Sequence, residues 1–181
     1  MAGCPRPPPS QRVRCVVIMD REDLRDGILA MWRRNNEILL YLLAQVPPRG
    51  MSALPVGSKG RDVTAQFAHL AKVRRGWVEY FTTGRYPRIP RYDKTKPPSK
   101  AALRKALVAS GRDVEQFLRR AIDEGARPKM FGRDPLRWCA YLIAHDSHHR
   151  GQILLALKQS GVRLPTKITI EGVWGKWIFG K

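Results

Sequence analysis

The sequence predicts an all-α fold, a bundle of four helices in a single domain. Four segments carry apolar residues at the three- and four-residue spacing of an amphipathic helix. Residues that commonly cap helices precede each segment, and stretches rich in proline and glycine separate the segments. At 181 residues, with 43% hydrophobic and 27% charged residues, the chain is long enough to build one full core.

The first helix is expected from about residue 21 to residue 46, with Asp20 as its N-cap. Residues 1–19 are expected to form a flexible tail rich in proline and arginine. Asn35 and Asn36 lie beside the apolar stripes of this helix, so one of them must point near the interior and find a hydrogen-bond partner. It is either an ordinary boundary asparagine or part of a functional pocket.

The second helix is expected from about residue 62 to residue 81, capped by Asp62 or its neighbour. Residues 82–98 contain four prolines and are too long for a tight helix hairpin. We interpret them as a crossover, which allows the second and third helices to run parallel. Ser99 caps a third helix that extends to about residue 122.

A fourth helix is expected from about residue 135 to residue 160, because Asp134 is a suitable cap and Pro135 fits a first turn. A short closing helix is expected over residues 171–179. The folded domain therefore extends from residue 20 to residue 181.

Three of the four histidines stand in one stretch of the fourth helix. His145 and His149 are four residues apart, so they differ by about 40° around the helix axis and can share one metal ion. A defined site needs a third ligand, and the remaining histidine is His69 on the apolar side of the second helix. His148 is ambiguous, because a pair with His145 is also geometrically possible. Ordinary structural histidines are the alternative interpretation of so short a pattern.

Further polar residues surround this pattern. Asp146 is about 100° from His145 on the helical wheel, where it supports the helix or the surroundings of a metal. Gln152 lies near the histidine face and could hydrogen-bond a bound group. With Asn35 and Asn36 these are the candidate residues around the site, and the sequence indicates no catalytic base. It contains neither the Glu-x-x-His pairs of di-iron bundles nor the HExxH motif of zincins.

The cysteines and the hydropathy exclude other classes of protein. Cys4, Cys15 and Cys139 form no CxxC and leave an odd count, which disfavours a disulfide framework and a thiolate metal site. Cys139 is expected in the core. Because no apolar run reaches the roughly 18 to 20 residues of a membrane helix and no signal peptide is visible, we expect a cytoplasmic protein without membrane contact.

The charge suggests a second class of function. The chain has 34 Lys and Arg against 15 Asp and Glu, a formal net charge of +19. The expected crossover is strongly basic, and Tyr86 and Tyr92 interleave with its cations. Such a segment can bind nucleic acid through phosphate contacts and base stacking, although a solvated loop has the same composition. A nucleic-acid-binding protein with merely structural histidines is therefore an alternative.

A lone histidine on the second helix, followed by an HxxxH pair that runs into Arg150-Gly151-Gln152, resembles the DinB / YfiT-like family of metal-dependent enzymes. The likeness extends from about residue 20 to residue 165. It implies an up-down-down-up bundle and a mononuclear site for a divalent ion, zinc or nickel, held by His69, His145 and His149. It also favours His149 over His148.

The resemblance implies a chemistry as well. Three neutral imidazoles leave coordination positions open, and the ion can lower the pKa of a bound water to about 7 or hold a thiol as thiolate. Characterised members of the family include thiol transferases that use low-molecular-weight thiols. We therefore expect a metal-dependent thiol S-transferase or a hydrolase that acts on a small molecule.

The apolar residues predict an assembly. The leucine- and tryptophan-bearing first helix and the C-terminal residues Trp174, Trp177 and Phe179 offer more apolar surface than a four-helix core needs. Because a symmetric pair is the commonest solution, and DinB-like proteins often dimerise, we expect a homodimer.

Overall fold

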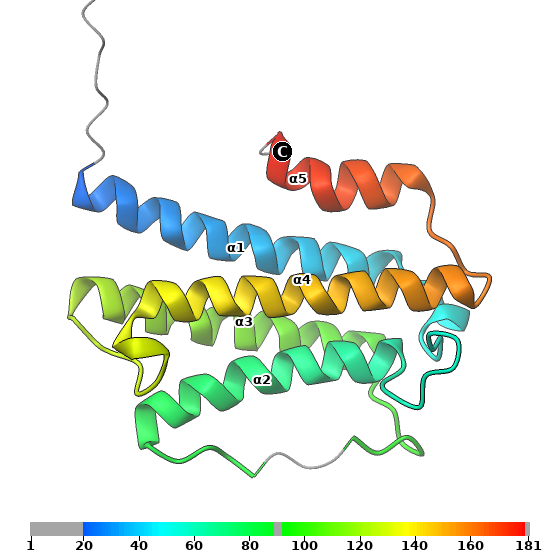
Figure 1. Cartoon of the computed structure of the whole chain (residues 1–181), viewed down its shortest axis with the longest axis horizontal. Coiled ribbons are helices and arrows are strands. Elements are labelled where there is room, and N and C mark those ends of the chain that lie inside the picture. The colour runs from blue at the N-terminus through cyan, green and yellow to red at the C-terminus, as the bar shows by residue number, and fades with distance from the viewer. Residues whose placement is uncertain (1–19, 89–91, 180–181) are drawn as a thin grey trace, which may run out of the picture.

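Four long helices pack side by side in the computed structural model, which describes residues 20–88 and 92–179 (Figure 1). They are α1 (Arg21–Gln45), α2 (Val63–Thr83), α3 (Lys100–Asp123) and α4 (Pro135–Gln159). No strand occurs within the described residues, so the predicted all-α bundle is confirmed. The tail expected over residues 1–19, with Cys4 and Cys15, lies outside the described part of the chain.

Each long helix begins at the capping residue that the sequence predicted. The cap side chain accepts a hydrogen bond from a backbone N–H of the first turn, which satisfies a donor that has no partner inside the helix. The four caps are Asp20, Asp62, Ser99 and Asp134.

Contacts at both ends of the bundle fix the helix directions. Arg25 at the start of α1 lies 3.6 Å from Asp123 at the end of α3, and Lys100 at the start of α3 donates to the Val46 carbonyl at the far end of α1. These two helices are therefore antiparallel. Figure 1 shows α1 and α4 running one way along the bundle and α2 and α3 running the other.

Short segments link the helices. Two 3-10 turns, η1 (Pro48–Gly50) and η2 (Phe131–Arg133), follow α1 and precede α4. None of the described helices combines the length and the apolarity needed to cross a membrane.

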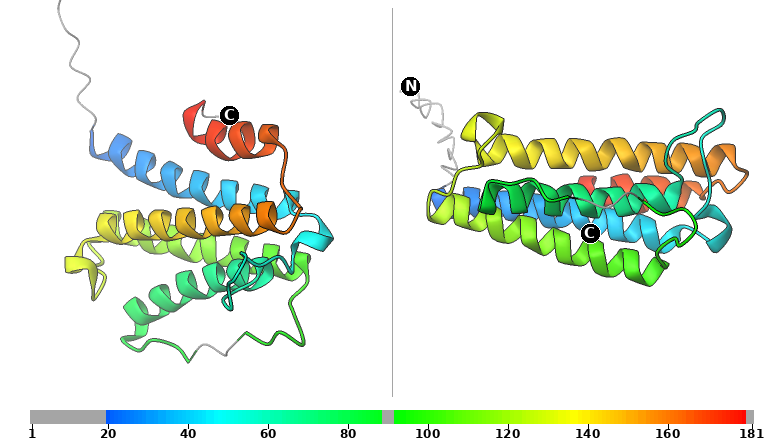
Figure 2. Two further views of the ribbon diagram at one scale, coloured as in Figure 1. Left: turned by 45° about the vertical axis from the view of Figure 1, so that its right-hand side comes forward. Right: turned by 90° about the horizontal axis from the view of Figure 1, so that it is seen from below.

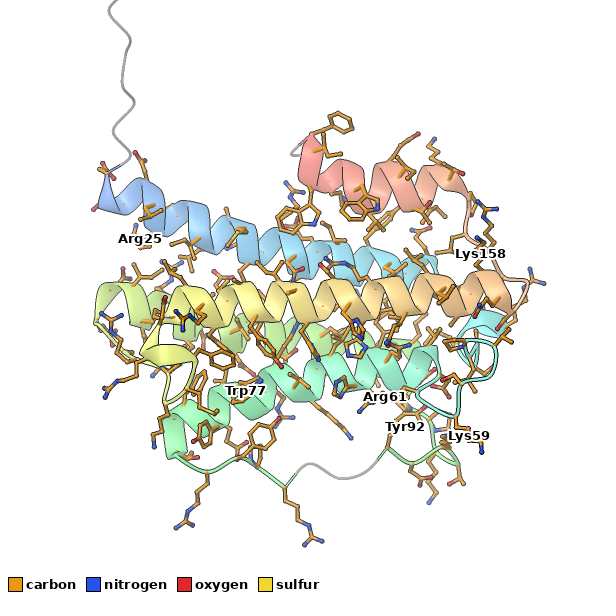
Figure 3. All side chains as sticks on the ribbon, viewed as in Figure 1. Arg25, Lys59, Arg61, Trp77, Tyr92 and Lys158 are labelled. Carbon is orange, nitrogen blue, oxygen red and sulfur yellow. The ribbon has the colours of Figure 1, made fainter. Side chains whose placement is uncertain are left out.

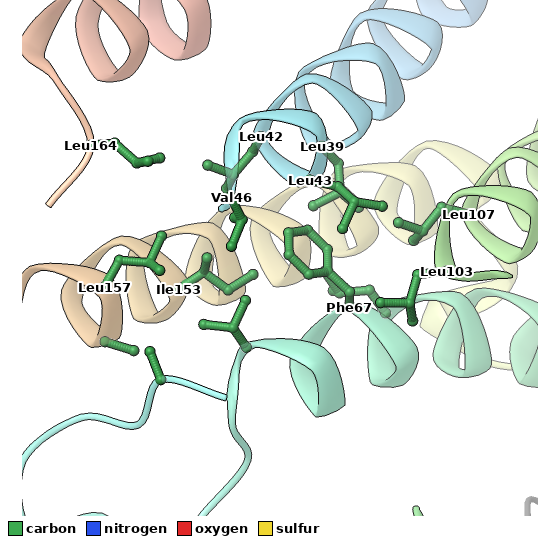
Figure 4. Packing of buried hydrophobic residues seen from close by; sticks show 14 of the residues in the cluster. Leu39, Leu42, Leu43, Val46, Phe67, Leu103, Leu107, Ile153, Leu157 and Leu164 are labelled. Carbon is green, nitrogen blue, oxygen red and sulfur yellow. The ribbon is translucent and has the colours of Figure 1, made fainter. Parts of the chain in front are cut away.

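The interior has two apolar clusters separated by a polar layer. One cluster, shown in Figure 4, gathers leucines of α1 around Phe67 of α2, and the other surrounds Trp32 and Trp138. Between them along α1, α2 and α4 lie fully buried Asn35, Arg74 and Asp146. The bundle therefore keeps charged groups at mid-height, where they must pair with each other.

The helical C-terminal segment is longer than the sequence predicted. It comprises the π-helical η3 (Lys167–Trp174) and α5 (Gly175–Ile178), so it begins at Lys167 rather than at residue 171. The backbone N–H groups of Ile168 and Thr169 both donate to the Pro165 carbonyl, which starts the first turn directly after the proline.

Packing against α1 explains this helix. Gly172 of η3 lies directly against the ring of Tyr41, and the ammonium of Lys176 lies 5.4 Å from the centre of the same ring. Figure 2 shows the segment beside α1, on the outside of the four-helix bundle. The β-branched residues around Ile168 disfavour a helix locally, and this tertiary contact overrides their preference.

Two helical glycines should respond oppositely to alanine. A Cβ at buried Gly111 would lie 2.5 Å from the Asn36 amide nitrogen, whereas one at exposed Gly151 would meet no atom within 4 Å. We expect Gly111→Ala to lower the free energy of unfolding by about 1–3 kcal/mol through overpacking. We expect Gly151→Ala to raise it by about 0.5–1 kcal/mol through helix propensity. Urea denaturation would measure both, and stabilisation by Gly111→Ala would contradict the close approach of α1 to α3.

Candidate metal centre

His69 of α2 and His145 and His149 of α4 meet on facing surfaces of the two helices. The ring centres are 5.3 Å apart for His69 and His145, 4.9 Å for His69 and His149, and 4.7 Å for His145 and His149. One ligand nitrogen from each ring lies within 4.8 Å of the others. The three histidines could therefore hold one metal ion, which we call the three-histidine site.

Contacts on both sides of His69 fix the position of α2 against α4. Gln66, one turn before His69, contacts His149, and Arg74, further along α2, pairs with Asp146 at 2.5 Å. The helical repeat then places His69 between these two contacts, opposite His145 and His149.

The polar atoms of the histidines suit a metal ligand. His149 Nδ1 lies 2.7 Å from Gln66 Oε1. Because a carbonyl oxygen only accepts, this bond places the proton on Nδ1 and leaves Nε2 with a free lone pair. The buried Nδ1 of His145 has no hydrogen-bond partner among the described residues. Both observations fit imidazoles prepared to donate a lone pair to a cation.

The surroundings keep these imidazoles neutral. The pKa of His69 is lowered to about 4, mainly by burial and then by the positive charge of Arg61. The pKa of His149 is lowered to about 3, mainly by burial and then by the neighbouring histidines. Burial also lowers the pKa of His145, although the charge of Asp146 partly opposes the shift. Since only neutral imidazole can bind a metal, all three rings are available at neutral pH.

These shifts predict how the stability of the metal-free protein depends on pH. His69 has an ordinary pKa of 6.5 when unfolded and a folded value of about 4, so the unfolded chain binds more protons between these values. The contribution of neutral His69 to the free energy of unfolding is therefore fully present above pH 6.5, and it is lost as the pH drops towards 4. Melting temperatures measured with chelator across this window should fall with acidification, and His69→Gln should flatten the dependence. A melting temperature that rises on acidification would contradict the neutral, buried state of the histidines.

The structure distributes the other predicted residues over two environments. Asn35 and Asp146 are fully buried, and Asn35 donates to Asp146 at 2.6 Å, while Asn36 accepts from Arg74 at 2.7 Å. Gln152 is hydrogen-bonded to exposed His148 at 2.8 Å. A role for these four residues in a metal or substrate pocket stays a prediction.

His148 and Cys139 both lie outside the three-histidine site. His148 is exposed on α4 and is not among the three histidines whose ring nitrogens lie close together, and the choice of His149 as a ligand stays a prediction. Cys139 is fully buried, and burial raises the pKa of its thiol to about 12, so it is a core residue.

Gln66 and Arg74 were not identified from the sequence. Gln66 precedes His69 by three residues and therefore shares its helix face, which is a signal that could have been used. Arg74 stands next to Arg75, and α2 buries Arg74 while it exposes Arg75. Only the position of the neighbouring helices decides which arginine is inside.

The protein is therefore a four-helix bundle with a candidate mononuclear metal site. One histidine of this site comes from α2, and an HxxxH pair comes from α4. The family model of the DinB superfamily matches residues 31–153, a span that includes all three histidines. The chain belongs to the DinB superfamily. A search of curated proteins found no match.

Proposed function

We propose that this protein binds one divalent ion, zinc or nickel, through His69, His145 and His149, and uses it in a reaction on a small molecule. The observation that carries the proposal is the meeting of three neutral imidazoles, of which His69 and His145 are only partly buried. Three protein ligands at a partly exposed position are typical of a catalytic metal site, whereas structural zinc sites are closed by four. When bound, the ion supplies Lewis acidity that favours a deprotonated nucleophile at neutral pH.

The lack of an obvious base favours thiol transfer over hydrolysis. Asp146 influences His145 through its charge, but it is fully buried and held by Arg74 and Asn35. We therefore do not assign it as a base. A thiol loses its proton far more readily than water, so a low-molecular-weight thiol as co-substrate requires less from the protein. Hydrolysis of a small molecule is the second form of the proposal.

A panel of small thiols and electrophiles, assayed with and without chelator, tests this proposal. We expect metal-dependent loss of free thiol that stops on addition of chelator and returns on addition of zinc or nickel. Activity that persists in chelator would remove the metal from the reaction.

Nucleic-acid binding is the competing function. Arg85, Arg88, Lys94 and Lys96 are exposed along the connection between α2 and α3. The ring of Tyr86 packs on Trp77 of α2, however, which engages one of the two tyrosines expected to stack on bases. Retention on a nucleic-acid column that decreases steeply with salt would favour this alternative, because each neutralised phosphate adds to the salt dependence. A second alternative is that the protein binds a metal for a structural purpose and catalyses no reaction. The expected cytoplasmic location stays a prediction.

We further propose a homodimer through the outer face of the C-terminal segment. Ile170, Trp174 and Ile178 are four residues apart and 53%, 59% and 69% exposed, and Phe179 extends the same apolar surface at 68%. The other residues expected to form this surface are less exposed. Trp177 is half-buried, and Trp32 and Leu39 of α1 are buried inside the bundle, so Trp32 and Leu39 are not available to a partner.

Light scattering at physiological salt, which screens the net charge of +19, tests this assembly. We expect twice the monomer mass of 20.6 kDa for the wild type and the monomer mass for Trp174→Ser. A wild-type protein that stays at 20.6 kDa over a wide concentration range would exclude the homodimer.

A further inference from the structure

An exposed aromatic ring adjoins the three-histidine site. Tyr141 precedes His145 by one helical turn on α4, and the two rings are stacked, with centres 5.8 Å apart and planes at 28°. The Tyr141 side chain remains 36% exposed. A molecule bound at the histidines would therefore find exposed aromatic surface directly beside it.

Three further rings extend this surface away from the histidines. The ring centres of neighbouring members are close together: they are 5.0 Å apart for Tyr141 and Phe131, 5.1 Å for Phe131 and Trp77, and 5.7 Å for Trp77 and Tyr86. We call Tyr141, Phe131, Trp77 and Tyr86 the aromatic shelf. Its members come from α4, η2, α2 and the connection after α2, so four separate segments converge to form it.

Two features of the backbone allow the shelf to form. Gly76 of α2 lies directly against the Tyr86 ring, and any side chain there would displace that ring. Phe131 adopts a left-handed conformation with φ 59°, which a non-glycine residue adopts at an energetic cost. Such costs are commonly found at functional sites.

Core packing alone does not explain the shelf. Trp77 and Phe131 are partly buried and pack against the apolar cluster around Trp32 and Trp138, so they also contribute to the core. Tyr86 and Tyr141 are 47% and 36% exposed, so much of their ring surface faces solvent. Apolar ring surface that is open beside a polar site is typical of ligand pockets, in which a few polar groups orient a mostly apolar ligand.

The opposite side of the three-histidine site is basic. Arg61, in the loop before α2, acts on His69 through its positive charge. Figure 3 labels Arg61 and Trp77, which lie towards opposite ends of α2. A ligand in the site would therefore meet positive charge at one end and aromatic rings at the other.

From this arrangement we infer that the substrate carries an aromatic or other planar unsaturated ring next to its metal-binding anionic group, and that the ring packs on the aromatic shelf. The inference rests on the proposed metal-dependent function and specifies the substrate class for the same site. In this proposal Tyr141 is a binding residue whose exposed ring surface packs against the ring of the ligand, and Arg61 attracts the anionic end.

Two small metal-binding probes test this substrate class. Benzohydroxamate and acetohydroxamate share one metal-binding group, and only the former has a ring. We expect zinc-loaded wild-type protein to bind benzohydroxamate more tightly by roughly two- to twelvefold, the range of an aromatic pair, as measured by calorimetry. Tyr141→Ala should abolish this preference and Tyr141→Phe should keep it. Leu155→Ala, which removes an exposed side chain elsewhere on α4, should leave it unchanged.

The outcomes separate the two proposals. Equal binding of the two probes by zinc-loaded wild-type protein overturns the aromatic substrate and leaves the metal site standing. A preference that survives unchanged in Tyr141→Ala also overturns the role of the shelf. Failure of the protein to bind zinc at all overturns both proposals together.

Discussion

Asp146→Ala is expected to lower the free energy of unfolding by about 3–5 kcal/mol, the usual cost of leaving one partner of a buried ion pair uncompensated. Asp146 and Arg74 are both fully buried, with Arg74 Nη2 donating to Asp146 Oδ2 at 2.5 Å. The guanidinium of Arg74 also lies 4.9 Å from the centre of the Trp32 ring. Without the carboxylate, the positive charge of Arg74 would remain buried and would lose the counter-charge that it pairs with.

The loss should spread through the polar layer. Asn35 donates to the same Asp146 oxygen and accepts a bond from Arg150 Nη1 at 2.7 Å. Removing Asp146 therefore leaves the Asn35 amide without its acceptor as well. Since α1, α2 and α4 all contribute to this layer, one substitution weakens the contacts of three helices.

An exposed ion pair provides the matched control for this prediction. Arg33 and Glu115 are 2.7 Å apart on the surface, so Glu115→Ala should cost no more than about 1 kcal/mol. Urea denaturation of the two variants gives the comparison. The double variant Arg74→Met with Asp146→Leu should recover much of the loss, because an apolar pair of similar volume needs no counter-charge. Equal costs for Asp146→Ala and Glu115→Ala would show that the buried pair contributes nothing particular.

His149→Ala is expected to have the largest effect on metal binding and to abolish stoichiometric binding of zinc. His149 is the most buried of the three histidines, and its bond to Gln66 fixes the ring with Nε2 available. Because two imidazoles make a weak and poorly defined site, the remaining pair should not retain the ion at micromolar concentrations. Competition with a chromophoric chelator would measure the affinity, and circular dichroism would verify the fold.

Neighbouring residues supply the controls. His148→Ala removes an exposed imidazole one position away and should leave zinc affinity unchanged. Gln66→Ala keeps all three imidazoles and removes only the bond that orients His149, so we expect a loss of roughly 10- to 100-fold. If His148→Ala reduced the affinity as much as His149→Ala, the assignment of the ligands would be wrong.

Sequence analysis correctly identified the features that depend only on residues close together along the chain. Capping by Asp20 or Ser99 depends on a few neighbouring residues, and the shared face of His145 and His149 follows from the helical repeat alone. His69 was selected because it was the remaining histidine on an apolar face. The structure brings these three histidines together, and metal binding by them stays a prediction.

The features that sequence analysis missed depend on how the helices lie against each other. Burial of Arg74 rather than Arg75 follows from the position of Asp146 on another helix. The early start of the C-terminal helix depends on the contact between Gly172 and the ring of Tyr41. The aromatic shelf combines rings from four segments, and no spacing along the chain indicates that they meet.

Anomalous diffraction from crystals of the protein, produced without a histidine tag or a nickel column, would test the metal site most directly. The proposal predicts one strong peak per chain at the zinc or nickel absorption edge, bounded by the imidazoles of His69, His145 and His149. A metal-replete crystal with no peak between these rings, or with its peak at His148 and Gln152, would contradict it.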